Sequence, residues 1–277
     1  YRFKRRLINH IYKLKVSITK ENKSNSYRFD DAKDYWNNIP KSEGSEPWNS
    51  KELLKLDDRT LIEKFNKERN RTYRNEQRNT GYNIVLPELK NIKSPYVMDY
   101  GSGIGFYGIE VLDKIPDSKV VFCDISESNL EVINRITKIL KFKQRVKSFL
   151  VTDKKSRDLN FNEKFDLILS MGVLHHTPYS KQIIKKLKAF LKKNGILSVM
   201  LYNKHYKKRL SLKRGITINN KTFGELTDPT RDGLKNPFSE DFDDKKALKL
   251  FGKDFILVSK FYPTPDYNFY KFVYRPN

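Results

Sequence analysis

Residues 96–105 read Tyr-Val-Met-Asp-Tyr-Gly-Ser-Gly-Ile-Gly, and from residue 101 every second residue is a glycine. The pattern is D-x-G-x-G-x-G, and Asp99 precedes the first glycine by two positions. Because glycine has no Cβ, the backbone of such a turn can approach a ligand closely. The turn holds no lysine or arginine, which suits an uncharged or cationic ligand better than a phosphate. The charge of Asp99 suits a ligand ammonium group or orders the turn. The candidate binding residues here are Asp99, Gly101, Ser102, Gly103 and Gly105.

Two further acidic residues stand at the ends of β-prone runs. Asp124 directly follows residues 119–123, about 20 residues after the glycines, where a carboxylate can accept hydrogen bonds from both hydroxyls of a ribose. Dinucleotide-binding enzymes place an acid there too, so Asp124 indicates a nucleoside without choosing one. Asp153 follows residues 146–151 and either accepts from an adenine amino group or caps the local turn.

Two adjacent histidines are the candidate catalytic residues. His175 and His176 lie in residues 165–178, which read Phe-Asp-Leu-Ile-Leu-Ser-Met-Gly-Val-Leu-His-His-Thr-Pro. Histidine exchanges a proton near neutral pH, so either ring could remove a proton from a substrate. Either ring could equally be structural and bind backbone carbonyls of the loop. Both interpretations stay open on the sequence.

A regular alternation of strand and helix patterns begins at residue 96 and positions these side chains. We predict strands at residues 96–98, 119–123, 146–151, 165–170 and 196–202, with helices at 104–112, 130–140 and 183–191, the last ended by Gly195. Such alternation is typical of an α/β fold with a mostly parallel sheet and helices on both faces. Residues 255–261 and 269–274 predict an antiparallel pair at the sheet edge. Ligands of such sheets bind beyond the carboxyl ends of the strands, where the candidate residues stand.

Residues 1–93 precede the first strand, and we predict a helical N-terminal extension that covers the pocket. Residues 51–79 predict one helix, whereas residues 22–50 are polar, contain prolines and predict an irregular connection. Residues 1–18 carry a basic amphipathic pattern. A helix of this kind packs on its own domain, or it makes a peripheral contact with a membrane or nucleic acid.

The glycine pattern resembles motif I of the class I S-adenosylmethionine (SAM)-dependent methyltransferases. The dinucleotide fingerprint G-x-G-x-x-G needs a third glycine where this sequence has Phe106, which disfavours a dehydrogenase. Residues 165–178 resemble the segment of the same superfamily in which strand four runs into a loop that closes over the cofactor. With Leu159-Asn160-Phe161 before it and residues 191–196 after it, the resemblance covers residues 94–202.

The resemblance implies a Rossmann-like SAM-binding methyltransferase domain over residues 94–277, with an insertion at 203–237. It implies S-adenosyl-L-methionine as the cofactor. No spacing of His, Cys and Asp residues predicts a metal site. Beyond the glycine turn, the implied cofactor contacts are Asp124, Ile125, Thr152, Asp153, Met171 and Tyr73. Tyr202 and Asn203, beyond strand five, either line the acceptor pocket or pack at the strand end. Methyl transfer needs alignment and exclusion of water, and a general base only when the acceptor holds its proton.

Other pieces are similar to a bacterial subgroup that acts on small substrates, namely Met200-Leu201-Tyr202-Asn203, Asp232-Gly233, Asn236-Pro237 and Arg71-Thr72-Tyr73. We therefore predict a small or medium-sized metabolite as the methyl acceptor. An RNA methyltransferase is the alternative, favoured by basic residues of the insertion. Strand four ends in Ser-Met-Gly-Val rather than the Asn/Asp-Pro-Pro-aromatic turn of the enzymes that methylate base amino groups. The RNA alternative therefore concerns targets other than base amino groups. A non-catalytic SAM-binding protein is a third interpretation.

The chain has a net charge of +23, from 56 Lys and Arg against 33 Asp and Glu. The lysines are scattered through most of the predicted helices, which favours solvated faces over a nucleic-acid partner but leaves that partner open. Cys123 is the single cysteine, so no intrachain disulfide can form. No apolar run approaches the length of a membrane span, and the expected location is cytoplasmic.

Overall fold

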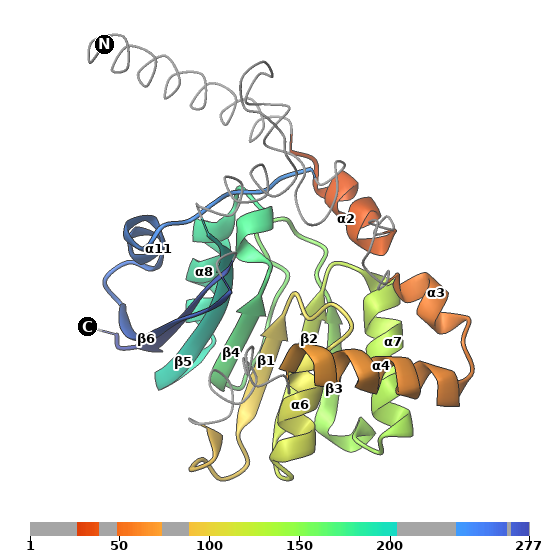
Figure 1. Cartoon of the computed structure of the whole chain (residues 1–277). Coiled ribbons are helices and arrows are strands. Elements are labelled where there is room, and N and C mark those ends of the chain that lie inside the picture. The colour runs from red at the N-terminus through yellow and green to blue at the C-terminus, as the bar shows by residue number, and fades with distance from the viewer. Residues whose placement is uncertain (1–26, 39–48, 74–88, 204–236, 265–266, 277) are drawn as a thin grey trace.

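A seven-stranded sheet with the order β3-β2-β1-β4-β5-β7-β6 runs through the computed structural model (Figure 1). The structure describes residues 27–38, 49–73, 89–203, 237–264 and 267–276. Strands β1 to β5 are parallel, and β7 runs antiparallel between β5 and β6. The bounds are β1 Tyr96–Tyr100, β2 Lys119–Asp124, β3 Val146–Leu150, β4 Phe165–Met171, β5 Leu191–Tyr202, β6 Phe255–Thr264 and β7 Tyr267–Tyr274. The predicted Rossmann-like α/β sheet with an antiparallel C-terminal pair is confirmed.

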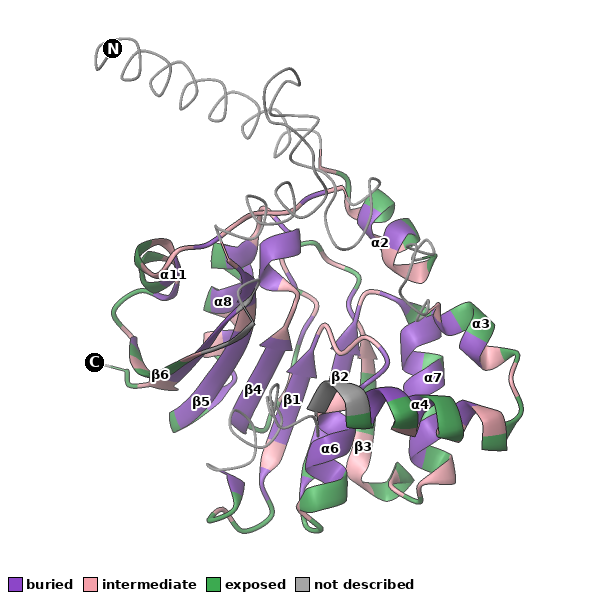
Figure 2. Ribbon diagram, viewed as in Figure 1, coloured by how far each residue is buried: buried purple, intermediate pink, exposed green. Residues whose placement is uncertain are grey.

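Helices cover both faces of this sheet. One hydrophobic core joins the strands to α8 and α11, and a second joins them to α4, α6 and α7. Figure 2 shows the central strands β1, β2, β4 and β5 largely buried, while the edge strands β3 and β6 and the outer faces of the helices are partly exposed. The helices are α2 Phe29–Asn37, α3 Ser50–Leu54, α4 Asp58–Tyr73, α6 Phe106–Lys114, α7 Glu127–Ile139, α8 Ser180–Lys188 and α11 Asp244–Phe251, with 3₁₀ turns η2 Lys143–Arg145 and η3 Leu174–His176. In the described ranges, no helix is long and apolar enough to cross a bilayer.

The chain before β1 differs from the sequence prediction in two places. Residues 51–79 do not form one helix, because Asp57 accepts hydrogen bonds from the backbone N–H (2.9 Å) and hydroxyl (2.6 Å) of Thr60 and begins a second one. Residues 22–50 are not wholly irregular, because they contain α2. That helix is nine residues long and buries Ala32 and Tyr35, so its short apolar stripe does not stand out in an otherwise polar stretch.

The end of α8 also differs from the prediction. Gly195 does not end this helix, which stops at Lys188. The N–H of Phe165 donates to the carbonyl of Phe190 at 2.8 Å, so the chain enters the sheet before Gly195. Gly195 lies instead within β5, at the register shift between the Phe165–Leu191 and Leu167–Ile196 pairs, where a Cβ would approach the Lys192 carbonyl oxygen to 2.9 Å.

Side chains of the sheet domain hold α3 and α4 in place. Arg135 of α7 donates to the Leu54 carbonyl (3.0 Å), the Leu56 carbonyl (2.7 Å) and the carboxylate of Asp58 (2.7 Å). The ring of Phe65 stacks on Phe106, the first residue of α6, at 5.0 Å between centroids. These contacts connect α4 to the helix that follows the glycine turn. The division of the chain at residue 93 stays a prediction.

Candidate active site

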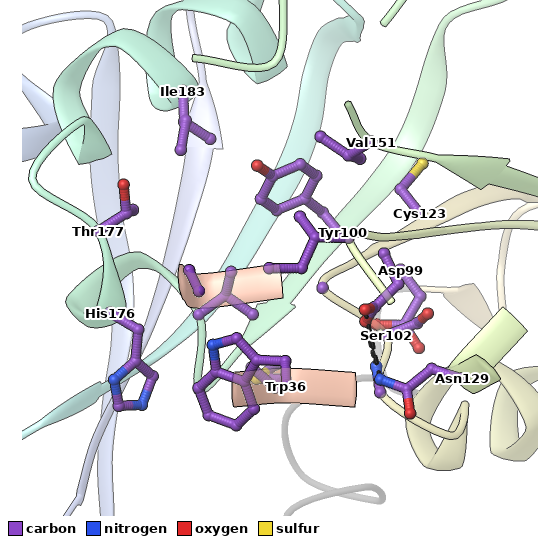
Figure 3. A pocket seen from close by; sticks show the side chains of 18 of the residues that line it. Trp36, Asp99, Tyr100, Ser102, Cys123, Asn129, Val151, His176, Thr177 and Ile183 are labelled. Carbon is purple, nitrogen blue, oxygen red and sulfur yellow. Dashed lines mark hydrogen bonds between the residues drawn. The ribbon is translucent and has the colours of Figure 1, made fainter. Parts of the chain in front are cut away.

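A cavity of about 310 Å³ lies beyond the carboxyl ends of β1, β2 and β4, with α2 on its far side (Figure 3). Parallel strands end at the same edge of a sheet, so residues far apart in sequence meet here. The predicted site residues in its wall are Asp99, Gly101, Ser102, Gly103, Asp124, Ile125, Asp153, Met171 and His176. Their roles in binding or catalysis remain predictions.

The glycine turn uses its own N–H groups to bind the end of β2. The N–H groups of Gly101 and Ser102 donate to the carbonyl of Cys123 at 2.7 and 3.1 Å. The N–H of Gly103 donates to Oδ2 of Asp124 at 2.8 Å. A phosphate-binding turn presents such groups to its ligand. Because these three are already bonded, the turn suits an uncharged or cationic nucleoside.

Glycine suits two positions of the turn for different structural reasons. Gly101 has φ +69°, and a Cβ built on it would lie 2.2 Å from Cγ2 of Val173 in the loop after β4. Gly103 has φ +54°, and a Cβ there would meet no atom within 4 Å. Glycine at the first position therefore permits close packing against the β4 loop. At the second it keeps the cavity side of the backbone open.

Asp99 is buried at the base of the cavity, with 1% of its surface exposed. Its Oδ2 accepts from the N–H of Gly108 in α6 at 3.0 Å, so the carboxylate orders the start of that helix. Burial raises the pKa of Asp99 to about 7, against the Gly108 hydrogen bond that lowers it. A cationic ligand group would favour the ionised form.

Asp124 ends β2 and is 6% exposed. Its Oδ1 accepts from the N–H of Ser126 (2.8 Å) and from Nδ2 of Asn129 (3.3 Å), while Oδ2 binds the Gly103 N–H. Burial raises the pKa of Asp124 to about 6 despite these donors. The carboxylate is therefore fixed between the glycine turn and α7, at the position expected of a ribose-binding acid.

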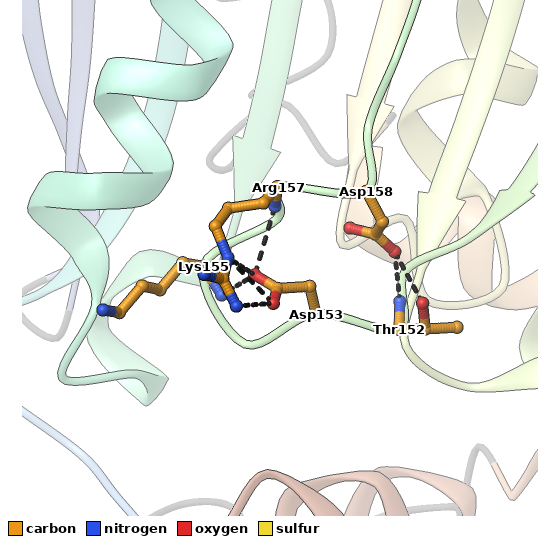
Figure 4. A network of polar contacts seen from close by, with 5 residues as sticks. All are labelled: Thr152, Asp153, Lys155, Arg157 and Asp158. Carbon is orange, nitrogen blue, oxygen red and sulfur yellow. Dashed lines mark hydrogen bonds and ion pairs between the residues drawn. The ribbon is translucent and has the colours of Figure 1, made fainter.

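The loop after β3 holds its acidic and hydroxyl groups in local contacts (Figure 4). Asp153 pairs with Arg157, whose Nη2 lies 2.6 Å from Oδ2, and this hydrogen-bonded pair holds the pKa of the carboxyl well below its usual range. Asp158 accepts from the N–H (2.6 Å) and hydroxyl (2.9 Å) of Thr152. Asp153 still lines the cavity, but Arg157 competes for its oxygens, and Thr152 is outside the cavity wall.

The two histidines occupy different environments. His176 lines the cavity, and its Nδ1 lies 3.2 Å from the carbonyl oxygen of Phe238. His175 is outside the cavity wall, fully buried, with its ring 3.8 Å from that of Tyr202. Burial, followed by the adjacent His176, lowers the pKa of His175 well below its usual 6.5. Only His176 is placed to contact a ligand in this cavity.

Three other predicted residues, Tyr202, Asn203 and Gly105, are not among the described residues that line the cavity. Tyr202 is buried, and its carbonyl accepts from the N–H of Phe242 at 2.9 Å. Asn203 donates through Nδ2 to Oδ1 of Asn268 at 2.8 Å, which fits packing at the strand end. Gly105 precedes α6 and packs against Ile133. Tyr73 is the last residue of α4, and its side chain lies outside the described part of the chain, as do residues 1–18 and 204–236.

Sequence reasoning missed a group of lining residues. These are Tyr27, Phe29, Ala32 and Trp36 on or beside α2, together with Tyr100, Asn129 and Lys154. The tryptophan in an otherwise polar stretch was the one available signal, because an indole is rarely left in water. Asn129 gave no signal, since its place beside Asp124 depends on the start of α7.

The lining fits S-adenosylmethionine, which carries an ammonium group, a sulfonium centre and a ribose diol. Three carboxylates face the cavity, from Asp99, Asp124 and Asp153, against one lysine, Lys154. Aromatic rings from α2, β1 and α6 form much of the rest of the wall. Within the described residues, no group of three His, Cys, Asp or Glu side chains could hold a metal ion.

Comparisons with known proteins agree with this site. Residues 98–197 match the family model described as a methyltransferase domain. The chain is 27% identical over 159 residues to a tRNA U34 carboxymethyltransferase of Campylobacter jejuni, an alignment that covers 56% of this chain and 51% of that protein. It is 33% identical over 114 residues to the tRNA U34 carboxymethyltransferase of Campylobacter fetus, covering 41% and 38%. The chain thus spans about half the length of the curated relatives it matches, or less.

Solved structures share the fold. An O-methyltransferase family protein from Burkholderia thailandensis superposes with a TM-score of 0.53 at 13% identity, covering 83% of this chain and 69% of that one. An O-methyltransferase family 2 protein from Planctomyces limnophilus, solved with apigenin, gives 0.51 at 17% identity, covering 78% and 61%. These superpositions show a shared fold, and the family match over residues 98–197 identifies a SAM-dependent methyltransferase domain within the chain.

Proposed function

We propose that this protein transfers the methyl group of SAM to a hydroxyl of a small or medium-sized metabolite. The observation that carries the proposal is the cavity itself, which joins the glycine turn and Asp124 to His176 under α2. Methyl transfer mainly requires aligned reactants and the exclusion of water, and a cavity that brings these groups together can align them. The cofactor would supply an activated methyl group. Asp99, Asp124 and the glycine turn would hold it.

His176 carries the argument for a hydroxyl acceptor. A carbonyl oxygen only accepts hydrogen bonds, so the contact with Phe238 requires Nδ1 of His176 to carry the proton. In the neutral ring, Nε2 then has the lone pair and can accept a proton. An alcohol or phenol keeps its proton at neutral pH and needs such a base. His176 would remove that proton as the oxygen becomes methylated.

The first test is cofactor binding followed by turnover. Calorimetry should show binding of SAM and of its demethylated product, and labelled methyl groups should appear in a compound of a metabolite extract. Asp124→Ala should weaken SAM binding by roughly 30-fold or more, because a buried charged acceptor is lost. His176→Phe should keep SAM binding and lose most turnover. Binding of a nicotinamide dinucleotide without SAM would refute the proposal, and SAM binding without any turnover would favour a non-catalytic SAM-binding protein.

Methylation of RNA is the second candidate. It is favoured by the curated relatives, which are named tRNA U34 carboxymethyltransferases, and by the charge of +23. Transfer RNA incubated with the protein and labelled SAM should then acquire the label. No labelling of tRNA, with labelling of a metabolite, would exclude it. A cytoplasmic location stays a prediction under either candidate.

A further inference from the structure

Helix α2 lines one side of the cavity with Phe29, Ala32 and Trp36. Its Trp36 is half-buried, and the indole lies 5.1 Å from the His176 ring at an interplanar angle of 62°. Figure 3 shows the indole reaching into the cavity beside His176. Because the reactive methyl group must face His176 under the proposed function, Trp36 flanks the place where the sulfonium centre has to lie.

The chemistry of an indole fits a sulfonium. The face of an aromatic ring carries partial negative charge and attracts cations, tryptophan most strongly. SAM is a cation at sulfur, whereas its demethylated product, S-adenosylhomocysteine, is a neutral thioether. An aromatic contact at that atom therefore distinguishes the cofactor from its product, while a contact that only fills space does not.

The end of α2 is fixed to the same turn that holds Asp124. Oδ1 of Asn37 accepts from the hydroxyls of Ser126 (2.7 Å) and Ser128 (3.1 Å) at the start of α7. The N–H of Ser126 in turn donates to Oδ1 of Asp124 at 2.8 Å. The hydroxyl of Ser128 also contacts that of Ser50 at 2.7 Å, which extends the contact to α3. Asn37 thus sets the position of the adjacent Trp36 relative to the cofactor-binding acid.

We propose that Trp36 is a cofactor-binding residue that recognises the positive sulfur of SAM, and that Asn37 is its positioning residue. The inference rests on the proposed function in one respect, namely that SAM is the cofactor. It adds a selectivity for cofactor over product to a helix that has no part in the glycine motif.

The test compares the affinities for SAM and S-adenosylhomocysteine by calorimetry. Trp36→Leu fills similar space without a π face, so it should weaken SAM binding by roughly five- to tenfold and change S-adenosylhomocysteine binding by less than about twofold. Trp36→Phe should lose less SAM affinity, because a phenyl face is a weaker partner. Equal losses for both compounds in Trp36→Leu, or no loss for either, would overturn the inference.

A matched pair of variants tests the positioning residue. Asn37→Ala should lower the preference for SAM over S-adenosylhomocysteine by about threefold, because one hydrogen-bonded anchor of α2 is lost. Asn38→Ala is the control, since its side chain is exposed and its hydrogen bonds among the described residues go to the Asp34 carbonyl (2.9 Å) and Nζ of Lys51 (2.8 Å). An equal effect of both variants would show that general weakening of α2, not Asn37, is responsible.

A fluorescence measurement needs no change at Trp36. The chain has two tryptophans, so Trp48→Phe leaves Trp36 as the single indole reporter. SAM should quench or shift its emission, and S-adenosylhomocysteine should do so less. An unchanged emission on SAM binding would overturn the inference even if Trp36→Leu fails to fold. Failure of the unaltered protein to bind SAM would instead remove the proposed function and the inference together.

Discussion

Burial sets the acid–base behaviour of the two carboxylates beside the glycine turn. Asp99 and Asp124 are 1% and 6% exposed, and burial raises their pKa values to about 7 and about 6. Without a ligand, raised carboxyl pKa values stabilise the fold most below pH 3.8, and this contribution is lost as the pH rises through 6 and 7. A cationic ligand acts in the opposite sense, because it stabilises the ionised forms.

SAM binding should therefore depend on pH. Below pH 6 both carboxyls are protonated and offer no countercharge to an ammonium or sulfonium, whereas above pH 7 both are ionised. We expect affinity to rise about tenfold from pH 5.5 to 7.5, with proton release on binding near pH 6.5. Calorimetry in buffers of different ionisation enthalpy measures both quantities. Asp99→Asn should flatten the profile, and a steep profile in that variant would assign the pH dependence elsewhere.

His175 should act on stability rather than on the reaction. The ring is fully buried, and burial, followed by the adjacent His176, lowers its pKa well below 6.5 against a backbone contact with Met200 that raises it. Below pH 6.5 this histidine binds a proton in the unfolded chain but stays neutral in the folded chain, so the free energy of unfolding falls as the pH drops. His175→Phe should keep turnover and resist urea better than the parent protein at pH 5. Loss of turnover with SAM binding intact would instead make His175 part of the chemistry.

Two glycines in the turn between β1 and α6 should differ in their effects, because Gly101 packs against protein and Gly103 does not. Alanine at Gly101 would place a Cβ 2.2 Å from Val173 at a positive φ, so Gly101→Ala should lower the free energy of unfolding by about 2–4 kcal/mol. Alanine at Gly103 meets no protein atom, so Gly103→Ala should lower it by only about 1–2 kcal/mol.

For SAM binding, we expect the larger effect from the Gly103 variant rather than from the Gly101 variant. Gly103→Ala projects a methyl group toward the open cavity side and should weaken SAM binding by roughly tenfold or more in protein that remains folded. Urea denaturation and calorimetry on both variants measure the two effects. Equal stability losses with unchanged SAM affinity would show that the turn is a structural connection only.

The whole molecule carries a charge of +23, which is relevant to the choice between a metabolite and RNA. Binding to a nucleic acid releases counterions, so its affinity falls steeply with salt. For a metabolite acceptor, we expect methyl transfer to change by less than about twofold between roughly 50 and 200 mM salt. Turnover measured on the labelled extract compound gives this slope. A loss of more than about tenfold over that range would favour RNA.

The sequence by itself determined the sheet and the position of the cofactor site along the chain. Strand periodicity and the glycine turn are local properties, and the carboxyl ends of parallel strands must meet at one edge. Asp99, Gly103 and Asp124 could therefore be assigned to a single site before any coordinates. The start of α4 and the end of α8 could not be predicted from the sequence. The first depends on the Asp57 cap, and the second depends on the hydrogen bond between Phe165 and Phe190, through which the chain joins the sheet before Gly195.

Only the tertiary structure decided which neighbouring side chains face the cavity. His175 and His176 are adjacent in sequence, and their ring centroids lie only 4.1 Å apart, yet only His176 lines the cavity while His175 is fully buried against Tyr202. The pairing of Asp153 with Arg157 and the approach of Trp36 to His176 likewise result from chain packing. Side-chain direction in loops and the docking of a weakly apolar helix have no local pattern, so they follow from contacts that form only in the folded molecule.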